Sequence, residues 1–139
     1  MLPKQMRAIQ SSDIGHLRKA LVTSTNNVEA SGPRVTVVIC THNRPAALKR
    51  CLQALGRIND PNFSVVVVDS APESSDGECI AARYGSRYEV STAKGLSRAR
   101  NIGTRATFAD IVAYLDDDMI ADANWLKSLV VEFADSNVM

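Results

Sequence analysis

The stretch VTVVICTHNRP occupies residues 35–45 and sets a pattern that the rest of the chain repeats. Its first six residues carry no charge and are mostly β-branched, which is typical of a strand buried on both faces of a sheet. Polar residues follow at 41–44. Pro45 then suits the first turn of a helix, because its fixed φ fits there and no backbone N–H is needed. The stretch therefore predicts a buried strand, a polar turn and a helix.

The same order recurs along the chain. Apolar side chains at helical spacing after Pro45 predict one buried helix face, and later segments alternate in the same way. We predict strands at 35–40, 63–68, 87–90 and 111–115. We predict helices from Pro45, around 79–84, over 96–106 and after a capping Asp122. The last of these helices has an apolar stripe that includes Phe133. Strands alternating with helices predict an α/β fold, a mainly parallel sheet with helices on both faces.

Polar clusters follow three of the predicted strands at their carboxyl ends. Thr41 to Arg44 follow the first strand, Asp69 follows the second, and Asp116 to Asp118 follow the last. In open parallel sheets, ligands bind beyond the carboxyl ends of the strands. The sequence therefore predicts a binding site at this edge of the sheet.

The acidic triplet Asp116-Asp117-Asp118 is the most distinctive of these clusters. Two like charges ~5 Å apart repel by roughly 3 kcal/mol at an effective dielectric constant of ~20, a cost that a divalent cation would reverse. On an extended chain Asp116 and Asp118 point to the same side, and Asp117 points away. Carboxylate oxygens suit Mg²⁺ or Mn²⁺. A solvated acidic turn before a helix remains the alternative at this point.

Composition limits the other possibilities. With 139 residues the chain has room for one domain, and its formal charge of +1 argues against general attraction to nucleic acid. Residues 1–33 are predicted to form an N-terminal extension and linker, and residues 34–139 the domain. Three scattered cysteines without Cys-x-x-Cys spacing predict reduced, buried thiols.

The N-terminus lacks the continuous apolar core of a secretory signal. No window approaches the roughly 20 apolar residues that cross a bilayer, so no membrane segment is expected in this chain. We expect a cytoplasmic protein, with the cytoplasmic face of a membrane as the alternative location.

Four segments in order resemble those of family 2 glycosyltransferases of the GT-A fold. They are VVICTHNRP at 37–45, VVVDSAP at 66–72, GLSRARNIG at 95–103 and YLDDD at 114–118. The resemblance covers roughly residues 34–135. It implies a Rossmann-like GT-A domain whose nucleotide-sugar-binding half is present and which is incomplete at its C-terminus.

The resemblance also implies roles for individual residues. Thr41, Asn43 and Arg44 would line the nucleotide pocket, and Asp69 would accept a hydrogen bond from the base, uracil. The Ser70-Ala71-Pro72 that follows Asp69 departs from the family's common Asp-Asp-Gly-Ser at the base-binding position. The other implied donor-binding residues are Gly95, Arg100, Asn101, Asp116 and Asp117. Asp116 and Asp118 would hold Mg²⁺ or Mn²⁺, and His42 is expected to have no catalytic role.

The family reaction is inverting transfer of a sugar from a nucleotide diphosphate sugar, here a UDP-sugar, to an acceptor hydroxyl. In relatives the general base and most acceptor contacts lie well beyond the metal motif. Since residue 139 comes soon after Asp118, we expect a truncated transferase that binds the donor but lacks the acceptor half and the general base. The acceptor is unknown.

Functions of other classes remain open on the sequence alone. A non-catalytic nucleotide-binding module would bind the same ligand. A nucleotidyltransferase or a dinucleotide-binding domain needs glycines after the first strand, and residues 40–45 contain none. A phosphorylated receiver domain needs acidic residues there, where this chain has Thr41 to Arg44.

Overall fold

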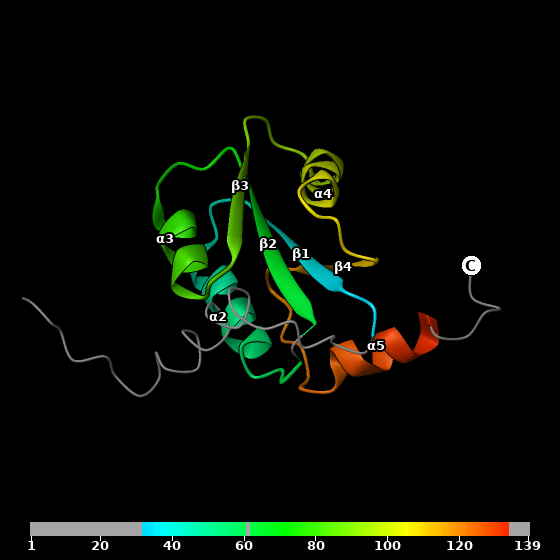
Figure 1. Cartoon of the computed structure of the whole chain (residues 1–139). Helices are drawn as coiled ribbons and strands as arrows, with labels where there is room; N and C mark the ends of the chain where they lie inside the picture. The colour runs from blue at the N-terminus through cyan, green and yellow to red at the C-terminus, as the bar shows by residue number, and fades with distance from the viewer. Residues whose placement is uncertain (1–31, 61, 134–139) are drawn as a thin grey trace, which may run out of the picture.

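The computed structural model describes residues 32–60 and 62–133 (Figure 1). Strands and helices alternate along them, as the sequence predicts. The elements in order are β1 (Val35–Thr41), α2 (Pro45–Leu55), β2 (Phe63–Ser70), α3 (Asp76–Arg83), β3 (Arg87–Ser91), α4 (Leu96–Arg105), β4 (Ile111–Asp116) and α5 (Trp125–Phe133). The predicted extension at 1–33 lies outside the described residues, except for its last two positions.

The four strands form one parallel sheet in the order β3-β2-β1-β4. In β1, every residue except Cys40 is buried, as expected for a strand covered on both faces. The register aligns the carboxyl ends, since Thr41 lies beside Asp69 and Cys40 lies beside Asp116. This alignment brings the three predicted polar clusters to one edge of the sheet.

Helices cover both faces of the sheet, which confirms the predicted architecture. On one face Val37 and Ile39 of β1 pack in a core with Leu48 of α2, Ala81 of α3 and Leu126 of α5. On the other face, a smaller cluster joins Val38, Val66 and Val68 to Ala99 of α4. Figure 1 shows α4 on the opposite side of the sheet from α2 and α3.

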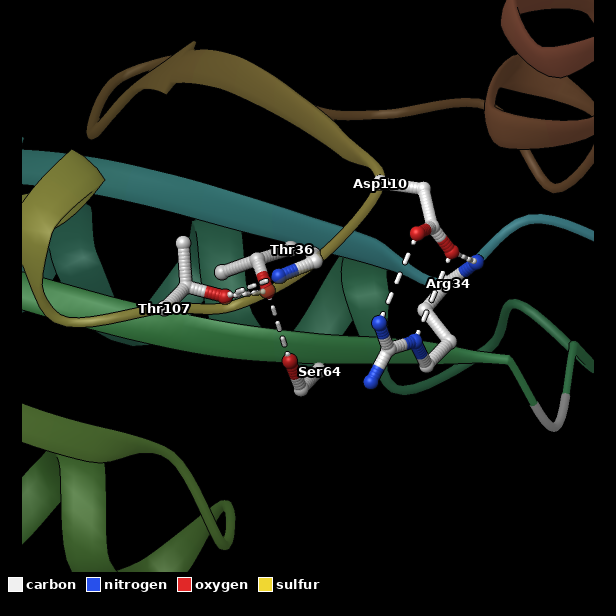
Figure 2. A network of polar contacts seen from close by, with 6 residues as sticks. Arg34, Thr36, Ser64, Thr107 and Asp110 are labelled. Atoms are coloured by element: carbon white, nitrogen blue, oxygen red, sulfur yellow. Dashed lines mark hydrogen bonds and ion pairs between the residues drawn. The ribbon is translucent and has the colours of Figure 1, made fainter.

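The amino-terminal edge of the sheet is tied together by polar contacts (Figure 2). The Thr36 hydroxyl lies 3.0 Å from that of Ser64 and 2.6 Å from that of Thr107. The Arg34 backbone N–H donates to Asp110 Oδ2 at 2.8 Å, and the Arg34 guanidinium lies against the same carboxylate. These contacts fasten the loop between α4 and β4 to β1.

Two local predictions need correction. Cys79 is exposed rather than buried, because α3 turns Gly77 and Ala81 inward and Cys79 lies between them on the other side. Phe133 is 54% exposed, because α5 buries Leu126 in its first turn whereas Phe133 is at its far end. Asp122 Oδ1 accepts the Asn124 N–H at 2.9 Å and the Asp122 carbonyl accepts the Trp125 N–H at 3.0 Å, so Asp122 caps the turn that leads into α5.

Of the three free thiols, Cys51 is buried and Cys40 is half-buried. Burial raises the pKa of the Cys51 thiol to about 12, so this side chain behaves as a small apolar group in the core. Across 32–60 and 62–133, no helix has both the length and the apolar character required to cross a bilayer.

Candidate functional site

A cleft of about 470 Å³ opens at the carboxyl edge of the sheet. Its walls come from the turn after β1, the end of β2, the segment that enters α4, and the acidic triplet after β4. The lining residues are Cys40, Thr41, His42, Arg44, Ser70, Lys94, Gly95, Leu96, Asp116, Asp117 and Asp118. Segments far apart in the sequence thus meet where α/β sheets place their ligands.

The acidic triplet divides into one buried and two exposed carboxylates. The Asp117 side chain is only 5% exposed, whereas those of Asp116 and Asp118 are 64% and 54% exposed. Asp117 accepts a hydrogen bond from the Thr41 hydroxyl at 2.8 Å and forms an ion pair with Arg44 Nη1 at 2.9 Å. Its charge is compensated inside the protein, so Asp116 and Asp118 are left to face the cleft.

Two arginines lie against these exposed carboxylates. Arg44 Nη2 reaches Asp118 Oδ2 at 3.2 Å, so a single guanidinium bridges Asp117 and Asp118. Arg100 Nη2 lies 3.9 Å from Asp116 Oδ1, and its guanidinium carbon lies 5.4 Å from the centre of the Tyr114 ring. Two guanidinium groups therefore offset part of the triplet's negative charge, and guanidinium groups can also contact an anionic ligand.

The donor set fits a hard divalent cation of the Mg²⁺ type. Such ions are bound by one or two carboxylates and complete their shell with water and substrate phosphates. Asp116 and Asp118 supply two exposed carboxylates on one cleft. No cluster of three or more His, Cys, Asp or Glu side chains suited to a metal occurs within the described ranges. An ion held here would take its remaining ligands from outside the protein side chains.

Asp69 lies in a separate recess next to the cleft. It is 4% exposed, and its Oδ2 accepts a hydrogen bond from the Tyr88 hydroxyl at 3.0 Å. Its Oδ1 is also buried, and no described residue donates a hydrogen bond to it. Burial raises the pKa of Asp69, and the Tyr88 hydrogen bond and nearby His42 oppose that rise.

The recess has a volume of about 10 Å³ and shares Thr41 and Arg44 with the cleft. A group bound in the cleft is therefore adjacent to Asp69. The recess is lined by Thr41, Asn43, Arg44, Pro45, Leu48, Asp69, Ser74, Asp76 and Gly77.

Asn43 and His42 shape the turn after β1. Asn43 adopts a positive φ of 49°, a conformation that asparagine tolerates better than most residues, and its Oδ1 accepts the Glu73 backbone N–H at 2.9 Å. His42 Nδ1 hydrogen-bonds to the Ser70 carbonyl oxygen, so this nitrogen carries the proton. Both contacts join this turn to the loop that follows β2.

The segment that enters α4 contributes unevenly to the site. Gly95 lines the cleft with φ at 140°, a backbone conformation that favours glycine. Asn101 is exposed on α4 and lines neither the cleft nor the recess. Arg100 meets the acidic triplet as described above.

Lys94, Leu96 and Tyr88 are among the residues of this region that sequence reasoning missed. Lys94 and Leu96 line the cleft, and their position on either side of Gly95 was the signal available. Tyr88 was missed as the partner of Asp69. Val90 pairs with Asp69 across the sheet, and Tyr88 lies two positions before Val90. Only this strand pairing brings the Tyr88 hydroxyl close to Asp69.

Comparison with known proteins supplies the family. The model of the Glycosyl transferase family 2 matches residues 36–138. The pre-mycofactocin glycosyltransferase of Mycobacterium tuberculosis is 34% identical over 119 residues, covering 78% of this chain and 23% of that protein. The validoxylamine A glucosyltransferase of Streptomyces hygroscopicus is 30% identical over 109 residues, covering 73% of this chain and 26% of that protein.

Two solved structures share the fold. The mannosyltransferase PcManGT from Pyrobaculum calidifontis, in complex with GDP-Man and Mn²⁺, has a TM-score of 0.71 at 24% identity, covering 90% of this chain and 40% of that one. A glucosyl-3-phosphoglycerate synthase from Mycobacterium tuberculosis, in complex with Mn²⁺, UDP and glucosyl-3-phosphoglycerate, has a TM-score of 0.64 at 16% identity, covering 99% of this chain and 47% of that one.

The chain thus spans about a quarter of the length of the two curated relatives, and less than half of each solved structure. The parallel sheet is that of GT-A proteins. Because the family model extends over well more than half of its residues, this protein belongs to glycosyl transferase family 2.

Proposed function

We propose that this chain forms the donor site of a glycosyltransferase that uses a UDP-sugar together with Mg²⁺ or Mn²⁺. The observation that carries the proposal is the pair of exposed carboxylates, Asp116 and Asp118, in a cleft that also holds cationic side chains. Carboxylates for a divalent ion and cations for phosphate oxygens are the two requirements of a nucleotide diphosphate site.

In this proposal Asp116 and Asp118 hold the ion, which when bound would stabilise the charge that develops on the departing diphosphate. Arg44 and Arg100 already contact these carboxylates and are suited to neutralise phosphate oxygens, as is Lys94 in the cleft wall. Thr41 holds Asp117 in place through its hydroxyl. Gly95 keeps the backbone free of a side chain where α4 begins.

Asp69 is the proposed partner of the base. Its buried Oδ1 has no donor among the described residues, and the N3–H of uracil is a donor of the kind that it lacks. A solved structure of the same fold was obtained with UDP, and another with GDP-Man. Uracil is proposed because it offers one N–H to one free oxygen.

The proposed reaction is inverting transfer of the sugar to an acceptor hydroxyl. Asp116, Asp118 and Asp69 are assigned to the donor, and Asp117 is neutralised by Thr41 and Arg44. These four aspartates therefore leave the role of general base unassigned.

Titration calorimetry of the 139-residue chain with UDP tests the donor site. We expect UDP to bind in the presence of Mn²⁺, and EDTA or Asp118→Ala to weaken binding at least about tenfold, since a metal ligand is lost. Glu132→Ala is the matched control, because it removes an exposed carboxylate of α5 that lines neither cavity. The proposal fails if neither EDTA nor Asp118→Ala changes UDP binding, or if a folded chain binds no nucleotide.

A further inference from the structure

Asp69 presents its two carboxylate oxygens differently. Oδ2 accepts the Tyr88 hydroxyl at 3.0 Å, whereas Oδ1 is buried and receives no hydrogen bond from any described residue. A carboxylate in water accepts donors at both oxygens. Here the fold supplies a donor to one oxygen only.

The first turn of α3 encloses the filled oxygen. A methyl group added at Gly77 would collide with Asp69 Oδ2 and would come within 3.5 Å of the Tyr88 ring. Gly77 itself is buried. The helix backbone and the Tyr88 hydroxyl thus both lie against Oδ2, which fixes the orientation of the carboxylate.

The Tyr88 phenol is suited to act as a permanent donor. Its own pKa is raised, by burial first and then by the hydrogen bond to Asp69, so it stays protonated at neutral pH. The same hydrogen bond stabilises the ionised form of Asp69 against the effect of burial. The Tyr88 phenol thus occupies Oδ2 as a donor, and Oδ1 has no donor among the described residues.

Nucleobases differ in how many donors they present to such an acceptor. Uracil has a single N3–H with a carbonyl on each side. Guanine has an N1–H beside an exocyclic amino group, a pair of donors that matches both oxygens of a free carboxylate. With Oδ2 already occupied, guanine would leave one of its donors unpaired in a buried place, which costs binding free energy.

We infer that Tyr88 is a specificity-determining residue that makes the site select a base with one imide N–H, uracil or thymine, over guanine. It acts by positioning Asp69 and by occupying its second oxygen. The inference rests on the proposed donor site.

The test compares the affinities of UDP and GDP for the 139-residue chain by calorimetry with Mn²⁺, before and after Tyr88→Phe. The native chain should bind UDP at least about fivefold more tightly than GDP, the lower end of the cost of one unpaired buried donor. Tyr88→Phe frees Oδ2, so the UDP-to-GDP affinity ratio should fall to near one. Tyr84→Phe, which removes a phenol hydroxyl from a residue that lines neither cavity, should leave the ratio unchanged.

If Tyr88 has a purely structural role, Tyr88→Phe would weaken the binding of UDP and GDP by the same factor and leave the affinity ratio unchanged. That result would overturn the inference. Equal or tighter binding of GDP by the native chain would overturn it as well, while Mn²⁺-dependent binding would still support the donor site. If the native chain is folded by circular dichroism and binds neither nucleotide, both the proposed function and this inference fail.

Discussion

Asp69 and Asp110 are two aspartates whose surroundings move their pKa values in opposite directions. Burial raises the pKa of Asp69 above its ordinary value of 3.8, and the charge of Asp117 adds to the rise. The hydrogen bond from the Arg34 backbone N–H, reinforced by the Arg34 side chain, lowers the pKa of Asp110. Asp69 lies at the carboxyl edge of the sheet, and Asp110 lies at the amino-terminal edge.

A raised pKa means that the folded state holds its proton more tightly than the unfolded state. Asp69 therefore contributes stability below its unfolded pKa, and this contribution is lost as the pH rises through its folded pKa. Asp69→Asn cannot titrate and keeps an acceptor for Tyr88. We expect the free energy of unfolding of the native chain to fall relative to Asp69→Asn as the pH rises from about 4 to about 7, measured by urea unfolding at each pH.

Asp110→Asn is the control of opposite sign. In the native chain the pKa of Asp110 is lowered, so its carboxylate contributes stability above the unfolded pKa. This contribution is lost as the pH falls through the folded pKa. The native chain should thus lose stability relative to Asp110→Asn toward acid pH. Parallel pH profiles for the native chain and Asp69→Asn would contradict the prediction for Asp69.

At the scale of elements, the close packing of α4 on the sheet depends on Gly103. The helix buries Ala99 and Gly103 one turn apart, and both are small. A methyl group at Gly103 would collide with Val38 Cγ1, a fully buried side chain of β1. The absence of a side chain lets the helix lie close to the central strand, and α4 carries Arg100 toward the acidic triplet.

We expect Gly103→Ala to destabilise the protein even though alanine favours helices. Overpacking a core costs about 1–3 kcal/mol, whereas replacing a helical glycine by alanine gains roughly 0.5–1 kcal/mol, so the net loss should be about 1 kcal/mol and at most about 2.5 kcal/mol. Urea unfolding measures the difference.

Asn101→Ala, on an exposed position of the same helix, supplies the comparison. It should leave the free energy of unfolding within about 0.5 kcal/mol of the native value. A Gly103→Ala variant as stable as Asn101→Ala would show that α4 can move away from β1 at no cost.

At the scale of the whole molecule, the fold gathers the proposed donor site from four separate segments. The chain spans about a quarter of the curated relatives that it matches. In the proposal Asp69, Asp116 and Asp118 contact the donor, and Asp117 is paired with Thr41 and Arg44. The proposal assigns no residue to the activation of an acceptor hydroxyl.

We therefore expect the 139-residue chain to bind a UDP-sugar without transferring the sugar. UDP release in the presence of Mn²⁺ and a panel of hydroxyl acceptors should be no faster than for Asp118→Ala, measured by chromatography. Transfer that depends on metal and is abolished by Asp118→Ala would refute this prediction and would place the general base within these residues.

The sequence by itself determined the order and type of the elements and the edge of the sheet where polar residues gather. Apolar periodicity is a local property: β1 reads as a buried strand, and the spacing of apolar residues after Pro45 shows the inner face of α2. The family motifs could be recognised for the same reason, because each lies within one short segment.

Only the tertiary structure decided which side chains meet. Thr41 and Asp117 are 76 positions apart, and Tyr88 lies 19 positions after Asp69, so no local pattern relates them. The burial of Asp117 and the exposure of Cys79 likewise depend on which neighbours cover each element. Hydrogen bonds and close contacts join residues through space, and strand order and helix placement bring those residues together.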